Sequence, residues 1–267
     1  MPDERVDDGR LGLARAATAK TATIAVIPAR FGSKRLPGKP LIDLAGRPMV
    51  ERVYRRTCCA KSIQRTIVAT DDERIQRAML PIGEVFMTGV EHESGSDRVA
   101  EVAREIDCDI VVNVQGDLPL VDPEMIDALV NALRNDDGVG IATAAVPIRS
   151  SNEFEDPAVV KVVFDLRGHA LYFSREPIPH ERDAPGAITG AWHHVGLYAY
   201  RRDTLLDFAV LAPTPLERKE KLEQLRALEN GIGIAVVACA GAPPLAVDTQ
   251  KDVNTVRQAL SRLDPDE

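Results

Sequence analysis

Continuous apolar runs recur along the first half of the chain, and apolar residues at helical spacing follow most of them. The first run, Ile24 to Ala29, predicts a buried strand. Similar runs predict strands over residues 65–70, 84–88, 109–117 and 140–147. Strands that alternate with helices favour an α/β fold with right-handed crossovers. We therefore expect a mostly parallel, doubly wound sheet.

Helix start signals separate these runs. They are Pro48 before one helix, Asp72 before a helix that reaches about Met79, the polar loop 92–98 before a helix over 99–106, and Asp122 with Pro123 before a fourth. Each of the first four predicted strands is thus followed by a helix start signal and a helix, as in the βαβ units of a parallel sheet.

The pattern changes after Ser151. Apolar residues at 159–164 and 170–173 flank Gly168 and predict a β-hairpin, and a loop rich in proline, glycine and charge follows over 174–191. Later segments predict a strand over 195–200, one long amphipathic helix over 216–230 closed by Gly231, a strand over 234–240 and a last helix after Asp252. We expect a flexible tail at residues 1–21 and a single domain over residues 22–267, within which residues 151–212 form a subdomain.

Composition narrows the class of partner. The chain has 267 residues, of which 45% are hydrophobic, and a net charge of -8, so its overall field repels nucleic acid and anionic membranes. Its four cysteines include no C-x-x-C pair and favour reduced thiols in a cytoplasmic protein. We find no apolar run of membrane-spanning length, and the acidic N-terminal segment lacks the pattern of a signal peptide.

A basic loop follows the first predicted strand directly. It carries Arg30, Lys34, Arg35 and Lys39 with no acid between the first and the last of these. Its two glycines let the backbone approach a ligand closely. Because α/β sheets bind ligands at the carboxyl ends of their strands, this loop indicates a polyphosphate site. The alternative is a solvated basic turn.

Two aspartates stand where extended segments give way to turns. Asp117 follows the fourth predicted strand, and Asp248 precedes the last predicted helix. A pair of carboxylates together with substrate phosphates suits Mg²⁺, whereas helix capping is the alternative for each aspartate. The chain has no G-x-x-x-x-G-K-[ST] loop, no G-x-G-x-x-G after the first strand and no G-x-S-x-G elbow, which disfavours a P-loop ATPase, a dehydrogenase and an α/β-hydrolase.

Eight motifs follow one another along the chain: Arg30-Phe-Gly-Ser-Lys-Arg-Leu-Pro-Gly-Lys-Pro-Leu41, Val68-Ala-Thr-Asp71, His92-Glu-Ser-Gly-Ser-Asp-Arg98, Val112-Asn-Val-Gln-Gly-Asp117, Ala170-Leu-Tyr-Phe-Ser-Arg175, His194-Val-Gly-Leu-Tyr198, Leu222-Glu-Gln-Leu-Arg226 and Val247-Asp-Thr249. In this order and spacing they resemble one enzyme family, the 3-deoxy-manno-octulosonate (Kdo) cytidylyltransferases, also called CMP-Kdo synthetases. The resemblance covers about residues 22 to 260. The first motif is shared with CMP-sialic acid synthetases, and the motifs from Tyr172 to Gln224 favour Kdo.

The resemblance implies a Rossmann-like nucleotidyltransferase fold and the reaction of CTP with Kdo to give CMP-Kdo and pyrophosphate. It also implies Mg²⁺ as cofactor, a role in lipopolysaccharide or related polysaccharide synthesis, and a homodimer built largely from the region after residue 150. Arg30, Ser33, Arg35 and Lys39 would hold the triphosphate, Arg30 and Lys39 acting in catalysis; Met87, Ser94, Gly95, Arg98 and Gln115 would surround the nucleotide; Asp117 and Asp248 would bind the metal; Arg175, Arg182, His194, Tyr198, Glu223 and Gln224 would contact the sugar acid.

One departure from the family concerns Leu118, where the family usually has a glutamate directly after the metal aspartate. Loss of that carboxylate would alter the surroundings of the metal or the contact to the sugar. Two alternatives therefore stay open. One is cytidylyl transfer to a related acid such as sialic acid or 8-amino-Kdo, and the other is a catalytically silent protein that binds a nucleotide sugar.

Overall fold

The sheet at the centre of the molecule is mixed but mostly parallel. The structure is a computed structural model that describes residues 22–32, 36–92 and 94–262. In the described chain, seven strands follow one another in the order β11-β7-β10-β6-β1-β4-β5. They are β1 (Thr23–Pro28), β4 (Arg65–Thr70), β5 (Glu84–Met87), β6 (Ile110–Asn113), β7 (Ile141–Pro147), β10 (Trp192–Arg201) and β11 (Ile234–Ala238). Only β10 runs antiparallel to its neighbours in this row, which confirms the α/β class expected from the alternation of strands and helices.

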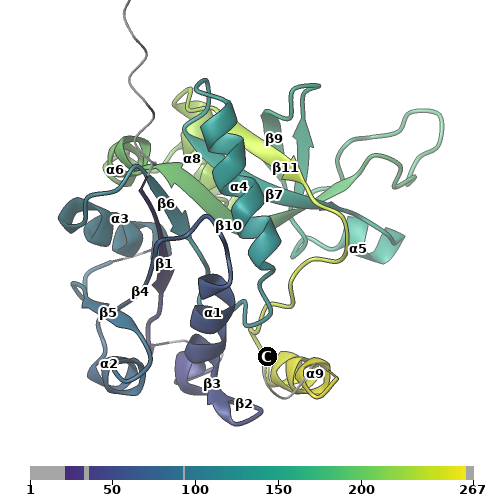
Figure 1. Ribbon diagram of the computed structural model, residues 1–267. Coiled ribbons are helices and arrows are strands. Elements are labelled where there is room, and N and C mark those ends of the chain that lie inside the picture. Colours follow the sequence, from purple (N-terminus) through teal and green to yellow (C-terminus); the bar gives the residue numbers. More distant parts are fainter. Residues whose placement is uncertain (1–21, 33–35, 93, 263–267) are drawn as a thin grey trace, which may run out of the picture.

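Helices cover both faces of this sheet (Figure 1). α1 (Met49–Cys58), α2 (Glu73–Met79) and α4 (Pro123–Asn135) share one hydrophobic cluster, and α3 (Gly95–Glu105), α6 (Arg202–Ala209) and α8 (Gln224–Glu229) share the other. Alternate residues of β1 divide between the clusters: Ala25 and Ile27 pack on the first, Ile24 and Val26 on the second. The two-residue period of a strand thus explains why the run at 24–29 is apolar throughout.

The predicted hairpin is present beside β10. β8 (Lys161–Phe164) pairs with β9 (Ala170–Ser174) and with the start of β10, after a short helix α5 (Ser151–Glu155). The hairpin and the long loop over residues 175–191 extend from one side of the sheet (Figure 1). β10 begins three residues before the predicted strand because its first residues pair with β8.

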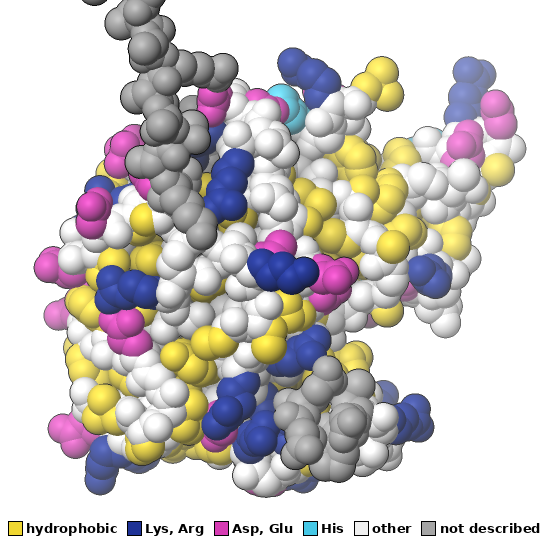
Figure 2. All heavy atoms as spheres, viewed as in Figure 1, with side chains coloured by type: hydrophobic (Ala, Val, Ile, Leu, Met, Phe, Trp, Pro, Cys, Tyr) yellow, Lys and Arg dark blue, Asp and Glu magenta, His cyan; other side chains and the backbone are white. Residues whose placement is uncertain are grey.

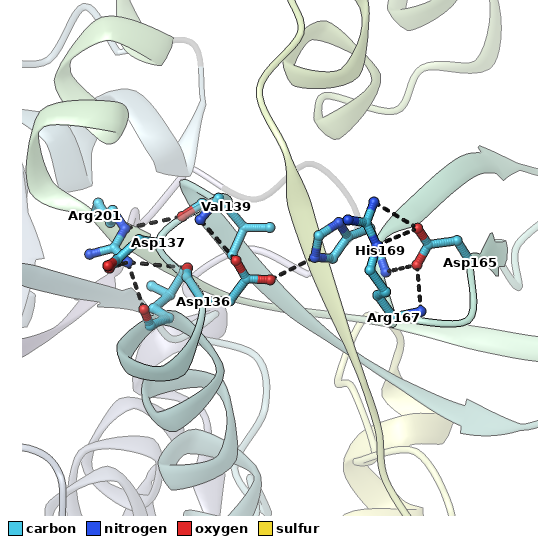
Figure 3. A network of polar contacts seen from close by, with 9 residues as sticks. Asp136, Asp137, Val139, Asp165, Arg167, His169 and Arg201 are labelled. Carbon is cyan, nitrogen blue, oxygen red and sulfur yellow. Dashed lines mark hydrogen bonds and ion pairs between the residues drawn. The ribbon is translucent and has the colours of Figure 1, made fainter.

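A polar network joins the hairpin turn to the end of α4 (Figure 3). His169 Nε2 lies 2.6 Å from Asp136 Oδ2, and this hydrogen bond lowers the pKa of the Asp136 carboxyl. Arg201, at the end of β10, donates to the carbonyl of Val139 at 3.1 Å and to Asp137 at 3.0 Å. The turn is thereby fixed to the edge of the sheet away from the carboxyl ends of its parallel strands.

The prediction of one long helix over residues 216–230 is wrong. The structure has two helices there, α7 (Pro215–Glu220) and α8. Lys221 adopts a left-handed conformation with φ of 55°, and its N–H donates to the carbonyl of Glu217, which ends α7. Arg226 then makes two hydrogen bonds to Glu217, at 2.6 and 2.9 Å, and holds the helices together across the break.

Smaller elements complete the described chain. A 3-10 turn η1 (Lys39–Leu41) and the strand pair β2 (Asp43–Leu44) and β3 (Arg47–Pro48) precede α1, and α9 (Gln250–Leu260) packs against β2. Lysine and arginine side chains gather near α1 and β2–β3 in Figure 2. These elements carry Arg47, Arg52, Arg55 and Arg56, which contact carbonyls or Glu51. Of the helices that the structure describes, none combines the length and apolar character needed to cross a membrane.

Candidate active site

A cleft of about 560 Å³ opens at the carboxyl ends of β1 and β6. Four parts of the chain that are distant in sequence form its walls. They lie at residues 28–49, at residues 92–98, at residues 115–117 and at Asp248. The position agrees with the rule that open α/β sheets bind ligands outside the carboxyl ends of their strands. Eight of the predicted site residues line this one cleft: Arg30, Lys39, Ser94, Gly95, Arg98, Gln115, Asp117 and Asp248.

The basic loop folds back on itself at Gly38. This glycine has φ of 69°, and its N–H donates to the carbonyl of Phe31 at 3.2 Å. A Cβ here would lie 3.1 Å from the Phe31 ring, so both the conformation and the close packing favour glycine. The guanidinium of Arg74 covers the same ring at 3.3 Å from its centroid. Arg30 is left exposed on the wall of the cleft, while Ser33 and Arg35 lie outside the described residues.

Lys39 lies between the two aspartates that the sequence predicts as metal ligands. Its Nζ is 2.8 Å from Asp117 Oδ2 and 3.0 Å from Asp248 Oδ1. The backbone fixes the two carboxylates relative to one another, because the N–H of Val247 donates to the carbonyl of Asp117 at 2.9 Å. Two carboxylate oxygens that converge on one cation form a donor set that fits Mg²⁺, which commonly binds one or two carboxylates plus substrate phosphates.

The N-terminus of α3 forms another part of the cleft wall. Ser94 caps the helix and exchanges hydrogen bonds with Asp97 in a capping box. Gly95 follows, and a Cβ there would lie 3.3 Å from the Pro28 ring, so the helix start packs closely against the end of β1. The free N–H groups and the dipole of a helix N-terminus attract anionic groups. This wall suits the nucleotide side of a substrate.

Arg98, one turn into α3, is 3% exposed and lines the cleft. Its guanidinium donates to Asp71 Oδ2 at 2.8 Å, to the Thr88 hydroxyl and to the carbonyl of Gly89. The sequence motif containing Asp71 gave no sign of this partnership, because the two residues are brought together only by the packing of α3 on β4. The buried charge is thus paired and held in one orientation.

The segment after β6 approaches the end of β1 very closely. A Cβ at Gly116 would lie 2.7 Å from the carbonyl oxygen of Pro28, a backbone atom, so only glycine fits. Gln115 next to it donates from Nε2 to Asn113 Oδ1 at 3.3 Å. A glycine between Gln115 and Asp117 indicates room beside the carboxylate in the sequence, whereas sequence reasoning missed the contact of Asn113 with Gln115.

A second hollow of about 990 Å³ adjoins the cleft and shares His92 and Ser94 with it. Glu223 lines this hollow, and its Oε2 accepts a hydrogen bond of 2.7 Å from Ser96 in α3. Burial raises the pKa of the Glu223 carboxyl. The break after α7 brings Glu223 to this position, since it stands at the N-cap of α8 rather than within a continuous helix.

Gln224 and His194 are buried, Tyr198 is partly buried, and none of the three lines the hollow. Gln224 is 6% exposed, and its Nε2 has no hydrogen-bond partner among the described residues. His194 Nε2 is 2.9 Å from the Thr143 hydroxyl, and its ring is 5.5 Å from that of Tyr198, four residues later on the same strand. Burial lowers the pKa of His194 to about 3, so its imidazole is neutral at physiological pH.

Three further predicted site residues, Arg175, Arg182 and Met87, line neither the cleft nor the second hollow. Arg175 donates to the backbone carbonyls of Glu220, Pro157 and Lys221. Arg182 is exposed on the loop between β9 and β10, and Met87, at the end of β5, is 40% exposed. The structure thus assembles the predicted nucleotide and metal residues more completely than the predicted sugar residues.

Comparison with known proteins gives concordant matches. A family model described as Cytidylyltransferase matches residues 24–234. The chain is 51% identical over 247 residues to 3-deoxy-manno-octulosonate cytidylyltransferase from Syntrophotalea carbinolica, covering 90% of this chain and 98% of that protein. It is 50% identical over 249 residues to the protein of the same name from Geobacter metallireducens, covering 90% and 98% respectively.

Solved structures agree with these matches. The structure of a CMP:2-keto-3-deoxy-manno-octonic acid synthetase complexed with CTP aligns with a TM-score of 0.85 and 41% identity, covering 91% of this chain and 99% of that one. A cytidylyltransferase from Leptospira borgpetersenii aligns with a TM-score of 0.61 at 16% identity, which is a likeness of fold.

Proposed function

The chain belongs to the cytidylyltransferase family, and on that premise we propose that it transfers CMP from CTP to the anomeric hydroxyl of Kdo, releasing pyrophosphate. One observation carries the proposal: a basic loop, a helix N-terminus and two carboxylates from four distant segments line one cleft. The names of the close relatives suggest Kdo and CTP as substrates. The cleft offers cationic side chains for phosphates and carboxylates for a metal ion.

Positioning and charge neutralisation are the main demands of this reaction. Phosphoryl-type transfer needs the attacking hydroxyl in line with the leaving group and needs the charge of the phosphates neutralised. Arg30 and Lys39 lie where their charges would bind the triphosphate and stabilise the departing pyrophosphate. The N-terminus of α3 at Ser94 and Gly95, with Arg98 and Gln115, would hold the nucleoside part. The predicted contributions of Ser33, Arg35 and Met87 stay predictions.

Asp117 and Asp248 would hold the Mg²⁺ ion. Their oxygens already meet at one cation, which supports this assignment. When bound, Mg²⁺ would neutralise phosphate charge and lower the pKa of the attacking hydroxyl. The contribution of the chain itself is to fix both carboxylates through the hydrogen bond from Val247 to Asp117.

The sugar acid would occupy the side of the cleft toward Glu223. This carboxyl and the unpartnered amide of Gln224 offer an acceptor and a donor for sugar hydroxyls. His194 and Tyr198 would form the floor, with His194 acting as a neutral hydrogen-bonding group rather than a cation. Arg175 and Arg182 stay predicted ligands of the sugar carboxylate, and Arg175 would have to leave its present carbonyl partners to serve in that way.

We also propose a cytoplasmic homodimer that supplies CMP-Kdo for lipopolysaccharide or a related polysaccharide. Two large apolar side chains on the hairpin support an interface there, since Leu166 is fully exposed and Leu171 is 62% exposed. Light scattering coupled to gel filtration should give the mass of a dimer for the native chain. Leu171→Asp should shift the protein towards the monomer, and an unchanged mass in that variant would remove the hairpin from the interface.

Pyrophosphate release is the test of the activity. The assay would offer CTP, UTP and ATP with Kdo, and then CTP with sialic acid or 8-amino-Kdo. We expect Mg²⁺-dependent release with CTP and Kdo at the highest rate. Asp117→Asn should abolish turnover with the fold retained, while Asp203→Asn, at a side chain that is 95% exposed, should be as active as the native chain. Absence of release with every sugar acid would refute the proposal.

A further inference from the structure

Lys39 lies where the proposed Mg²⁺ ion would bind the carboxylates, while its own ammonium would bind the phosphates of the nucleotide. Its Nζ contacts Asp117 and Asp248 at 2.8 and 3.0 Å, and its side chain is 14% exposed. The carboxylates belong to residues 78 and 209 positions away in the sequence. If these carboxylates bind Mg²⁺, and if Lys39 binds phosphate, the present contacts cannot persist in the loaded site.

Two cations cannot share these oxygens. Mg²⁺ requires its oxygen ligands at roughly 2.0–2.1 Å, and an ammonium on the same oxygens would stand beside the metal and repel it. We propose that Lys39 is the internal counter-ion of the metal site in the nucleotide-free protein. Phosphates draw its ammonium away, and the vacated carboxylates then accept the metal. Nucleotide and metal consequently bind cooperatively, and this inference rests on the proposed function.

The surrounding backbone lets the lysine side chain move alone. Pro40 next to it is buried, and the N–H of Leu41 donates to the carbonyl of Gly38 at 2.9 Å, which anchors the turn. The Asp248 N–H donates to Asp252 Oδ2 at 3.0 Å, so this ligand is also held at its backbone. The four-carbon stem of lysine is flexible. Exchange of partners therefore requires rotation of one side chain, while the turn at residues 38–42 keeps its backbone hydrogen bonds.

The first test measures metal binding without nucleotide. Mn²⁺ would be titrated into the full-length protein and the free ion followed by electron paramagnetic resonance. Lys39→Met removes the competing ammonium and should tighten Mn²⁺ binding by on the order of tenfold to a hundredfold, as expected for loss of two partly buried ion pairs. Arg30→Met removes a charge from the same cleft without touching the carboxylates, and it should change the affinity less than about threefold.

The outcomes separate direct competition from a general effect of charge. An unchanged Mn²⁺ affinity in Lys39→Met would overturn the proposal. So would an equal gain in Arg30→Met, because that result would show that any positive charge in the cleft opposes the metal.

The second test measures CTP binding by calorimetry in EDTA. Asp117→Asn removes one of the two carboxylates that hold Lys39 and leaves Asp248, so it should tighten metal-free CTP binding. This gain should be at least threefold larger with Lys39 present than in a Lys39→Met background. The double-mutant comparison removes the general effect of deleting a negative charge. Equal gains in both backgrounds would refute the exchange of partners. Failure of the native protein to bind CTP even with Mg²⁺ would instead refute the proposed function and leave the Mn²⁺ result standing.

Discussion

Replacement of the buried Lys161 by methionine should cause a large loss of stability. Lys161 lies in β8 with a side chain that is fully buried. Its ammonium donates to the backbone carbonyls of Asp156 at 3.0 Å, Val159 at 2.7 Å and Arg175. It thereby joins the loop before the hairpin to the end of β9, from which the loop over residues 175–191 departs.

The magnitude follows from the groups that the substitution leaves behind. Methionine has a similar length but no donor, so three partly buried carbonyls lose a charged partner. Each such hydrogen bond contributes about 1.5–3 kcal/mol. Burial opposes this gain, and it lowers the pKa of Lys161 for the same reason. The net loss should resemble that of breaking a buried ionic contact, about 3–5 kcal/mol. At roughly 2–4 °C per kcal/mol for a chain of this size, the melting temperature should fall by about 6–20 °C.

Urea unfolding followed by circular dichroism would measure the free energy of unfolding, and thermal unfolding would give the melting temperature. Lys219→Met is the matched control, because Lys219 is exposed on α7 and its loss should change stability by less than about 0.5 kcal/mol. A loss below about 1 kcal/mol in Lys161→Met would refute the reasoning. It would mean that the carbonyls find other donors, or that the burial penalty of the ammonium cancels its hydrogen bonds.

Three further predictions concern the site and its frame. Burial lowers the pKa of His194 to about 3, so between about pH 6.5 and pH 3 the unfolded chain takes up a proton that the folded chain does not. The free energy of unfolding should therefore fall as the pH falls through this window. His194→Phe should show a smaller decrease in melting temperature from pH 7 to pH 4.5. Gly116→Ala should cost about 1–3 kcal/mol and most of the activity, because its Cβ would meet a carbonyl oxygen at 2.7 Å, whereas Gly32→Ala, with nothing within 4 Å, should leave the free energy of unfolding unchanged. Asp71→Asn should destabilise the fold by about 3–5 kcal/mol, because it leaves the guanidinium of Arg98 buried without its carboxylate, and urea unfolding would measure this loss.

The sheet and the position of the cleft could be predicted from the sequence because both depend on local patterns. A run such as Ile24–Ala29 is apolar on both faces only when both faces are covered, and a basic loop at its end then falls at the carboxyl edge of the sheet. The division into a tail, one domain and a subdomain stays a prediction, and residues 1–21 lie outside the described chain.

Features that depend on contacts between distant residues could not be predicted in this way. The helix is interrupted at Lys221 although the neighbouring residues are good helix formers, because Lys221 adopts a left-handed conformation that usually requires glycine. The compensating contacts, from Arg226 to Glu217 and from Ser96 to Glu223, appear only in the folded chain. Likewise, no local pattern shows that Lys39 pairs with a carboxylate 209 residues later.

The role of Leu118, where this chain departs from the family, also depends on contacts that appear only in the folded chain. From the sequence alone, a leucine directly after Asp117 removes a carboxylate from the metal site. In the structure this side chain is 6% exposed and belongs to the main core cluster together with Val121 and Met125. Its backbone N–H donates to the carbonyl of Gln115 at 3.2 Å, so the turn that carries Asp117 forms without help from the side chain. The leucine therefore contributes apolar packing beneath the turn, while the charges that line the cleft come from Lys39, Asp117 and other residues. Leu118 does not line the cleft that the structure describes, and the proposed metal site rests on the carboxylates of Asp117 and Asp248.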